Sequence, residues 1–203
     1  MAQRGRPRGF DREDALRRAM EVFWVQGYDN ASLADLTRAM GINAPSLYAT
    51  FGSKEALFQE AVALYVRTEG SGIWEQVDTA ATARAAIEQV LRTTAEAFTR
   101  GATPRGCMIV LAAPQMQGAN AQVCDALKAH RQANGCLLER RLTRAVEEGE
   151  LPASTDCRAL ASYIVTLQHG MSIQARDGAS RETLLAIADC AMAGWEALTT
   201  DPN

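Results

Sequence analysis

Apolar residues recur three and four positions apart along most of this chain, the spacing that places them on one face of an α-helix. Between residues 11 and 27, Leu16, Ala19, Met20 and Phe23 keep this spacing, and Gly27 is expected to end the helix. No convincing alternation of apolar and polar residues accompanies the pattern. The sequence therefore predicts an all-α protein.

Two short helices separated by a glycine turn are expected next. Ser32 is a suitable N-cap, and Asp35 lies at capping-box spacing after it. Gly41 should end that helix. Asn43 can then cap the second, with Pro45 in the first turn, where a missing N–H costs no hydrogen bond. Their apolar positions can share one core: Leu33, Leu36, Met40, Ile42, Leu47 and Phe51.

Longer helices are predicted for the rest of the chain. Ser53 is expected to cap a fourth helix, and residues 69–72 form a break. Residues 106–117 are apolar nearly all round, which favours a short buried helix. The remaining expected helices cover residues 83–100, 120–148, 156–176 and 180–199.

Composition is that of an ordinary globular protein. Of 203 residues, 47% are hydrophobic and 22% charged, enough to bury a core. No apolar run reaches membrane-spanning length, and the basic N-terminus is not followed by an apolar stretch, so we expect a cytoplasmic protein without a membrane partner. The five cysteines are odd in number and have no C-x-x-C spacing, so neither a disulfide framework nor a metal site is expected, and no cofactor is predicted.

Charge is distributed unevenly although the net charge is only −3. The first ten residues hold three arginines and no acid, whereas residues 68–203 carry 12 basic and 16 acidic side chains. A basic arm on an acidic body suggests a local nucleic-acid footprint. Gly5 and Pro7 keep the arm extended, and arginine suits a narrow minor groove; a solvated, disordered tail is the alternative.

Residues 32–51 have the properties of a helix-turn-helix, whose second helix enters the major groove of DNA. Small or polar residues remain on the outer face of that helix. Tyr48 is expected to bury its ring and direct its hydroxyl to a phosphate, and Lys54 to hold another phosphate at a helix start. The alternative is a helical hairpin that serves only the core. The predicted DNA-binding residues are Arg4, Arg6, Arg8, Ser32, Asn43, Ala44, Pro45, Ser46, Tyr48, Ala49, Thr50 and Lys54.

Two sequence runs resemble the DNA-binding domain of the TetR family of bacterial transcriptional regulators. They are GYDNASLADL at residues 27–36 and MGINAPSLYATFGSKEALF at residues 40–58. The resemblance covers roughly residues 10–60, and residues 105–108 and 168–176 are similar to one branch of the family. It implies an all-α homodimer that binds operator DNA and releases it when a small molecule enters the larger domain.

This resemblance implies three segments: a basic arm at 1–9, a three-helix DNA-binding domain at 10–56, and a ligand-binding and dimerisation domain at 57–203. About nine helices are expected in this architecture. Many relatives carry Lys or Gly near Ala44 and Pro45, and His near Ala49 or Thr50. Because those side chains are missing here, we expect few base contacts and more reading of DNA shape.

The last two long helices, 156–176 and 180–199, are predicted to form the dimer interface, because both carry wide apolar faces. The alternative is that they pack only within one chain. An effector pocket should be concave and mostly apolar with few polar groups. Its candidate residues are Trp74, Phe98, Cys107, Met108, Leu111, Met116, Leu127, His130, Tyr163 and His169.

Cys107 also raises an alternative function. Following Arg105 and Gly106, it could be a thiolate at a helix start and could sense oxidants or electrophiles, although a small buried residue is the simpler interpretation. An enzyme is disfavoured, because no catalytic motif or phosphate-binding glycine loop is present. A purely structural DNA-binding protein and an activator remain rival hypotheses.

Overall fold

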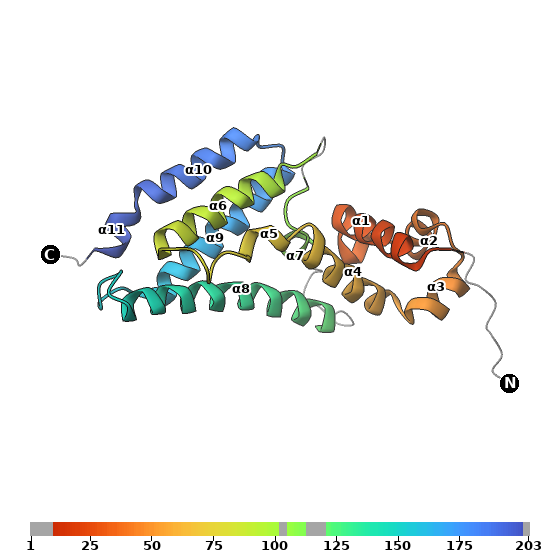
Figure 1. Ribbon diagram of the computed structural model, residues 1–203. Helices are drawn as coiled ribbons and strands as arrows, with labels where there is room; N and C mark the ends of the chain where they lie inside the picture. Colours follow the sequence, from red (N-terminus) through yellow and green to blue (C-terminus); the bar gives the residue numbers. More distant parts are fainter. Residues whose placement is uncertain (1–9, 102–104, 113–120, 201–203) are drawn as a thin grey trace.

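The computed structural model describes residues 10–101, 105–112 and 121–200, and these contain eleven helices and no strand. Figure 1 shows helices α1–α3 at one end of an elongated molecule and α6, α8, α9 and α10 at the other, with α4 passing between them. The all-α prediction is confirmed. None of the described helices is long and apolar enough to cross a membrane.

The N-terminal unit begins with α1 (Arg12–Asn30), which Asp11 caps by accepting hydrogen bonds from the N–H groups of Glu13 and Asp14. Gly27 adopts φ +75°, outside the helical region, but helical turns resume and continue to Asn30. The helix therefore does not end at Gly27 as predicted, since the glycine produces only a kink.

Three shorter helices complete this end of the molecule: α2 (Leu33–Met40), α3 (Ala44–Phe51) and α4 (Lys54–Thr68). Their shared core is aromatic. The Phe58 ring of α4 packs edge-on against both Phe23 and Tyr28 of α1, with centroid distances of 5.0 and 5.1 Å. The boundary expected after residue 56 falls within α4, so one continuous helix enters both parts of the molecule.

Two very short helices connect the longer ones. Helix α5 (Ser71–Trp74) lies where the sequence suggested only a break, and it leads to α6 (Ala83–Phe98). Helix α7 (Met108–Leu111) is the only helical part of the described residues in the expected 106–117 segment. Helix α8 (Ala121–Glu147) and helix α9 (Cys157–Arg176) match their predictions to within one residue at each end.

The predicted final helix is divided into α10 (Arg181–Ala193) and α11 (Trp195–Thr199). Gly194 lies between them, and its N–H donates to the Met192 carbonyl rather than extending the α-helical pattern. This division and helix α5 explain why the described residues hold more helices than the nine or so expected.

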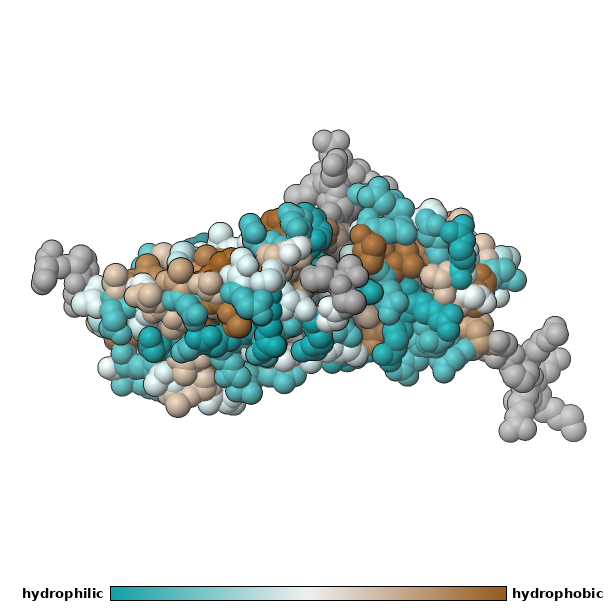
Figure 2. Space-filling model, turned by 90° about the horizontal axis from the view of Figure 1, so that it is seen from above, coloured by the Kyte–Doolittle hydropathy of each residue, from teal (hydrophilic) through white to brown (hydrophobic). Residues whose placement is uncertain are grey.

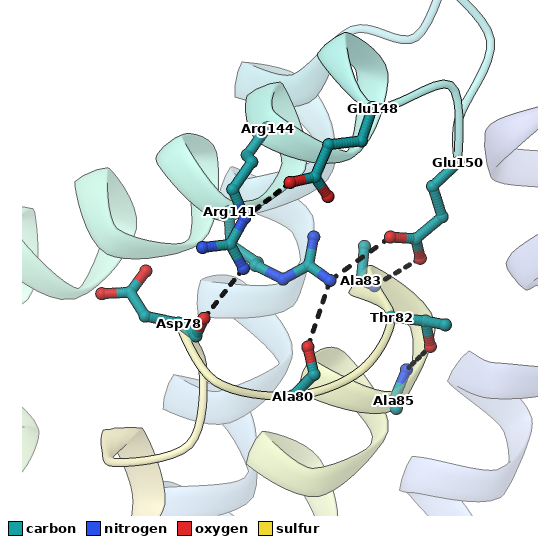
Figure 3. A network of polar contacts seen from close by, with 9 residues as sticks. All are labelled: Asp78, Ala80, Thr82, Ala83, Ala85, Arg141, Arg144, Glu148 and Glu150. Atoms are coloured by element: carbon teal, nitrogen blue, oxygen red, sulfur yellow. Dashed lines mark hydrogen bonds and ion pairs between the residues drawn. The ribbon is translucent and has the colours of Figure 1, made fainter.

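A buried arginine fixes the end of the C-terminal bundle (Figure 3). Arg141 is 1% exposed, and its Nη2 lies 3.3 Å from the Glu150 carboxylate and 3.4 Å from the Ala80 carbonyl. The other Glu150 oxygen accepts the backbone N–H of Ala83 at the start of α6. The nearby Arg144 donates to the Asp78 carbonyl at 2.8 Å. These contacts join α8 to the segment that precedes α6.

Candidate nucleic-acid interface and effector pocket

Local backbone chemistry determines where α3 begins. Gly41 takes the left-handed conformation that ends α2, with φ +67°, and its N–H donates to the Arg38 carbonyl. Two residues later, the Asn43 side chain accepts the Ser46 N–H at 2.9 Å. Pro45 occupies the first turn, so its lack of an N–H leaves no acceptor unpaired.

The inner face of α3 is held by buried residues. Leu47 and Phe51 are in the core. The Arg12 guanidinium covers the Phe51 ring at 4.6 Å and pairs with Glu60 of α4 at 2.7 Å. Helices α1 and α4 therefore brace α3 in a fixed orientation.

The outer face of α3 is open, as the helix-turn-helix hypothesis requires. Ser46 and Thr50 are half-buried, whereas the exposed residues are Asn43, Ala44, Pro45, Tyr48 and Ala49. Tyr48 is 46% exposed, so the prediction that its ring is buried is wrong. Leu47, its neighbour in the helix, occupies the inward position, and the phenol is left at the surface.

A shallow hollow lies beside this outer face. It is lined by Phe10, Ile42, Asn43, Ala49 and Thr50, among others. Because Phe10 is the first described residue, the chain enters the fold next to α3. The predicted contacts Arg4, Arg6 and Arg8 lie outside the described residues.

Ser32 and Lys54 lie at the starts of α2 and α4. The Ser32 hydroxyl accepts the Asp35 N–H and donates to the Asp35 carboxylate, which lowers the pKa of that carboxyl. The Lys54 ammonium lies 4.5 Å over the Tyr28 ring, and burial lowers its pKa. The Tyr28 hydroxyl donates to Glu55 at 2.8 Å, so this corner of the fold is closely packed.

Residues 15–61 match the family described as bacterial regulatory proteins, tetR family, and residues 81–188 match the tetracyclin repressor-like C-terminal domain. The chain belongs to the TetR family. The HTH-type transcriptional repressor ComR of Escherichia coli K12 is 34% identical over 96% of this chain and 93% of its own length. BdcR, from the same organism, is 32% identical over 97% of this chain and 93% of its own length.

Solved TetR structures agree with this assignment. A cysteine mutant of the TetR regulator CifR, complexed with 26-base-pair operator DNA, is 47% identical with a TM-score of 0.88. The alignment covers 94% of this chain and all of the CifR chain. A TetR regulator from Rhodococcus is 40% identical with a TM-score of 0.60, covering 90% of this chain and 97% of its own.

The C-terminal part of this TetR chain contains a cavity of about 60 Å³ between α4, α5, α8, α9 and the 107–110 segment. Four predicted pocket residues line it: Trp74, Cys107, His130 and His169. Sequence analysis missed several others, notably Tyr65, Arg131, Asn134 and Gln168. Each of these is polar within a helix, and the pattern alone did not indicate that their helices converge on one cavity.

The other pocket candidates lie elsewhere. Met108 and Leu127 are fully buried core residues, and Leu111 is half-buried without lining this cavity. Phe98 lines a separate hollow together with Trp24. Tyr163 is 40% exposed on the outer side of α9, because that position faces away from the bundle. Met116 lies outside the described residues.

Cys107 is enclosed rather than activated. It is 8% exposed, its N–H donates to the Ser172 hydroxyl at 2.8 Å, and its thiol is hydrogen-bonded to the Tyr65 side chain. Burial raises the pKa of the thiol above its ordinary value. The expectation of a thiolate at a helix start is not supported, since desolvation outweighs the single turn of α7 that follows.

The segment before α7 connects the two ends of the molecule. The Trp24 indole N–H of α1 donates to the Gly106 carbonyl at 3.1 Å, and the Arg105 guanidinium lies 5.4 Å over the same indole ring. Gly106 has φ +64°, and a Cβ there would lie 2.3 Å from the Ser172 carbonyl oxygen of α9. Residues 105–107 therefore lie in contact with α1, α9 and the cavity wall.

Proposed function

We propose that this TetR-family protein is a cytoplasmic transcriptional repressor that binds a palindromic operator as a homodimer and dissociates when a small molecule occupies the 60 Å³ cavity. The observation that carries the proposal is the exposed outer face of α3, braced from behind by α1 and α4. ComR and BdcR are repressors, and CifR has been solved on its operator. The proposal includes no catalytic step.

DNA reading is assigned to the N-terminal part, residues 10–56. In this assignment α3 lies in the major groove, with Asn43, Ala49 and Thr50 near base edges and Tyr48 at a phosphate. The starts of α2 and α4, at Ser32 and Lys54, are placed at the DNA backbone on either side. The arginines of the 1–9 arm extend into the neighbouring minor groove.

Dimerisation is assigned to α9 and α10 within residues 57–203. These helices share an apolar hollow that includes Tyr163, Leu167, Ile187 and Ala191. Figure 2, seen from the side of α10, shows apolar surface among polar residues over these C-terminal helices. Other apolar residues from the last two predicted helices are buried within the chain and are not available to a partner: Leu160, Ile164, Met171, Leu184, Ala188 and Trp195.

Effector release is assigned to the helices that the cavity shares with the DNA-binding end. Tyr65 and Val66 of α4 line the cavity, and so do Cys107 and Ile109 beside the Trp24 contact. In a dimer, the two α3 helices must lie about 34–36 Å apart to enter successive major grooves. A ligand that shifts α4 or the 105–107 segment changes this spacing and lowers DNA affinity.

Selection of DNA from a random pool tests the proposal directly. Bound sequences should converge on a palindrome whose half-sites lie about one helical turn apart. The variant Ile187→Glu should be monomeric and should bind the selected DNA weakly, because the substitution places a charge in the apolar hollow. Val25→Glu is the matched control, since Val25 is an exposed residue of α1. Convergence on no sequence, or binding by a monomer, would overturn the proposal.

A further inference from the structure

The cavity wall is basic and lacks acids. Arg131 and His130 of α8 and His169 of α9 all line it, and none of the lining residues is Asp or Glu. Arg131 is close enough to His169 to lower the pKa of its imidazole, in addition to the larger effect of burial. Burial and the neighbouring guanidinium thus favour the uncharged imidazole, whereas Arg131 keeps its positive charge and makes the wall unfavourable for a cation.

Gln168 of α9 is a second polar residue of the cavity wall. Its side chain is 3% exposed and lines the cavity, yet among the described residues no group forms a hydrogen bond with it. The amide atoms are not among the fully enclosed polar atoms without a partner, so the amide is accessible from the cavity and can bind a polar ligand there. Asn134 also lines the cavity without a described hydrogen bond. The wall thus presents amide donors beside the guanidinium.

Arg131 retains hydrogen-bonding capacity of its own. One guanidinium nitrogen, Nη1, donates to the Ile109 carbonyl at 2.9 Å. Within the described part of the chain the Arg131 side chain forms no ion pair, although ten ion pairs occur there between other residues. Its remaining N–H donors have the fork geometry that fits a carboxylate.

The size of the cavity limits the ligand. One water needs about 10–15 Å³ of such space, so the 60 Å³ cavity accommodates about four to six non-hydrogen atoms. The rest of the wall includes the apolar side chains of Ile73, Trp74 and Val110. A ligand with one polar end and a short apolar end therefore matches both parts of the wall.

We propose that the effector is a short-chain carboxylate anion whose carboxylate binds Arg131 and Gln168 and whose alkyl end faces Ile73 and Val110. This inference rests on the proposed effector-released function and specifies the ligand class of the same cavity. Arg131 also donates to the Ile109 carbonyl of α7, and α7 follows directly after the 105–107 segment that contacts Trp24. The bound anion therefore shares the guanidinium with this part of the chain.

Calorimetric titration of the purified full chain tests this. Propionate and butyrate should bind the protein and cause it to release operator DNA. Propionamide and butyramide, which match them in size but carry no charge, should do neither. Inorganic phosphate, an anion without an alkyl end, should bind more weakly than propionate. Equal affinity for the amides, tighter binding of phosphate, or no carboxylate binding at millimolar concentration would each overturn the inference. DNA binding without ligand, measured separately, tests the proposed function.

Two variants and one spectroscopic readout locate the site. Arg131→Met should weaken propionate binding about tenfold or more, since a charged hydrogen bond is lost. Lys128→Met is the control, because Lys128 is an exposed cation on the same helix. Should Arg131→Met fail to fold, NMR titration of the wild-type chain decides: the chain has only two histidines, and propionate should raise the pKa of His169. An unchanged His169 pKa would contradict the assigned site.

Discussion

The Trp24 side chain donates a 3.1 Å hydrogen bond to the backbone carbonyl of Gly106, a residue 82 positions away in sequence. Trp24 belongs to the helix that braces α3, and Gly106 adjoins a residue of the cavity wall. This bond therefore joins the proposed DNA-reading end to the proposed effector site without passing through α4.

Replacing Trp24 with Phe should uncouple the two ends. Removing one partner of a half-buried hydrogen bond lowers the free energy of unfolding by about 1 kcal/mol. Operator affinity without ligand should change little, since Trp24 is not on the outer face of α3, but more effector should be needed for release. Gel-shift titrations with and without effector measure both quantities. Release at an unchanged effector concentration would show that α4 alone carries the coupling.

Gly106→Ala should be strongly destabilising. The left-handed backbone costs about 1 kcal/mol for a residue with a Cβ, and the contact with the Ser172 carbonyl adds about 1–3 kcal/mol of overpacking. Gly135→Ala is the matched control: Gly135 lies within α8 with no atom near the added Cβ, so alanine should stabilise the helix by up to about 1 kcal/mol. Urea unfolding curves distinguish the two outcomes.

Arg141→Met should destabilise the C-terminal bundle by about 2 kcal/mol, because Glu150 loses its ion pair and keeps the Ala83 N–H, and the Ala80 carbonyl loses its Arg141 donor. The loss is smaller than for a fully satisfied buried pair, since Arg141 Nε and Nη1 have no partner among the described residues. Arg140→Met removes only an exposed ion pair with Asp78 and should cost under about 1 kcal/mol. Thermal unfolding of both variants gives the comparison, and equal losses would contradict this role.

Alkylation at neutral pH should discriminate among the cysteines. Cys136 is exposed on α8, away from the hollow assigned to dimerisation, and should react with iodoacetamide first, whereas Cys107 should react slowly because burial raises its thiol pKa. The folded chain holds this proton more tightly than the unfolded chain does. The contribution of Cys107 to the free energy of unfolding is therefore complete below the thiol pKa of the unfolded chain, about 8.5. It is lost as pH rises through the higher thiol pKa of the folded chain. Mass spectrometry of the alkylated peptides gives the order of reaction.

The same residue decides the redox hypothesis. A Cys107→Ser variant that still loses DNA binding normally in oxidants or electrophiles would exclude a sensing role for this thiol. Rapid alkylation of Cys107 together with a lost response in Cys107→Ser would instead support it and contradict the effect assigned to burial.

Tyr48→Phe should weaken operator binding about 30-fold per dimer, as two phosphate hydrogen bonds of about 1 kcal/mol each are lost. The loss should be similar for all DNA sequences, and folding stability should change little because the side chain is 46% exposed and its ring is kept. Thr143→Val removes an exposed hydroxyl on α8, outside α3 and the helices assigned to dimerisation, and serves as the control. A loss confined to one sequence would indicate base contact instead.

Local signals in the sequence were sufficient to predict α3. Asn43 and Pro45 act within a few residues of where they stand, so cap chemistry predicted where the helix begins. Tyr48 was misjudged because helical spacing cannot decide between adjacent positions at the edge of an apolar face. Gln168 and Arg131 were missed for a different reason: their role depends on α8 and α9 meeting beside α4, and such long-range packing leaves no local pattern.

The continuity of α4 has a mechanical consequence. A 15-residue α-helix is about 22 Å long, so a tilt of about 5° at its cavity end displaces the opposite end by about 2 Å. Under the proposed release mechanism, a rotation of α4 at the cavity therefore moves the end of the helix that begins just after α3 by this distance. A shift of that size would be enough to misalign a reading helix with its groove.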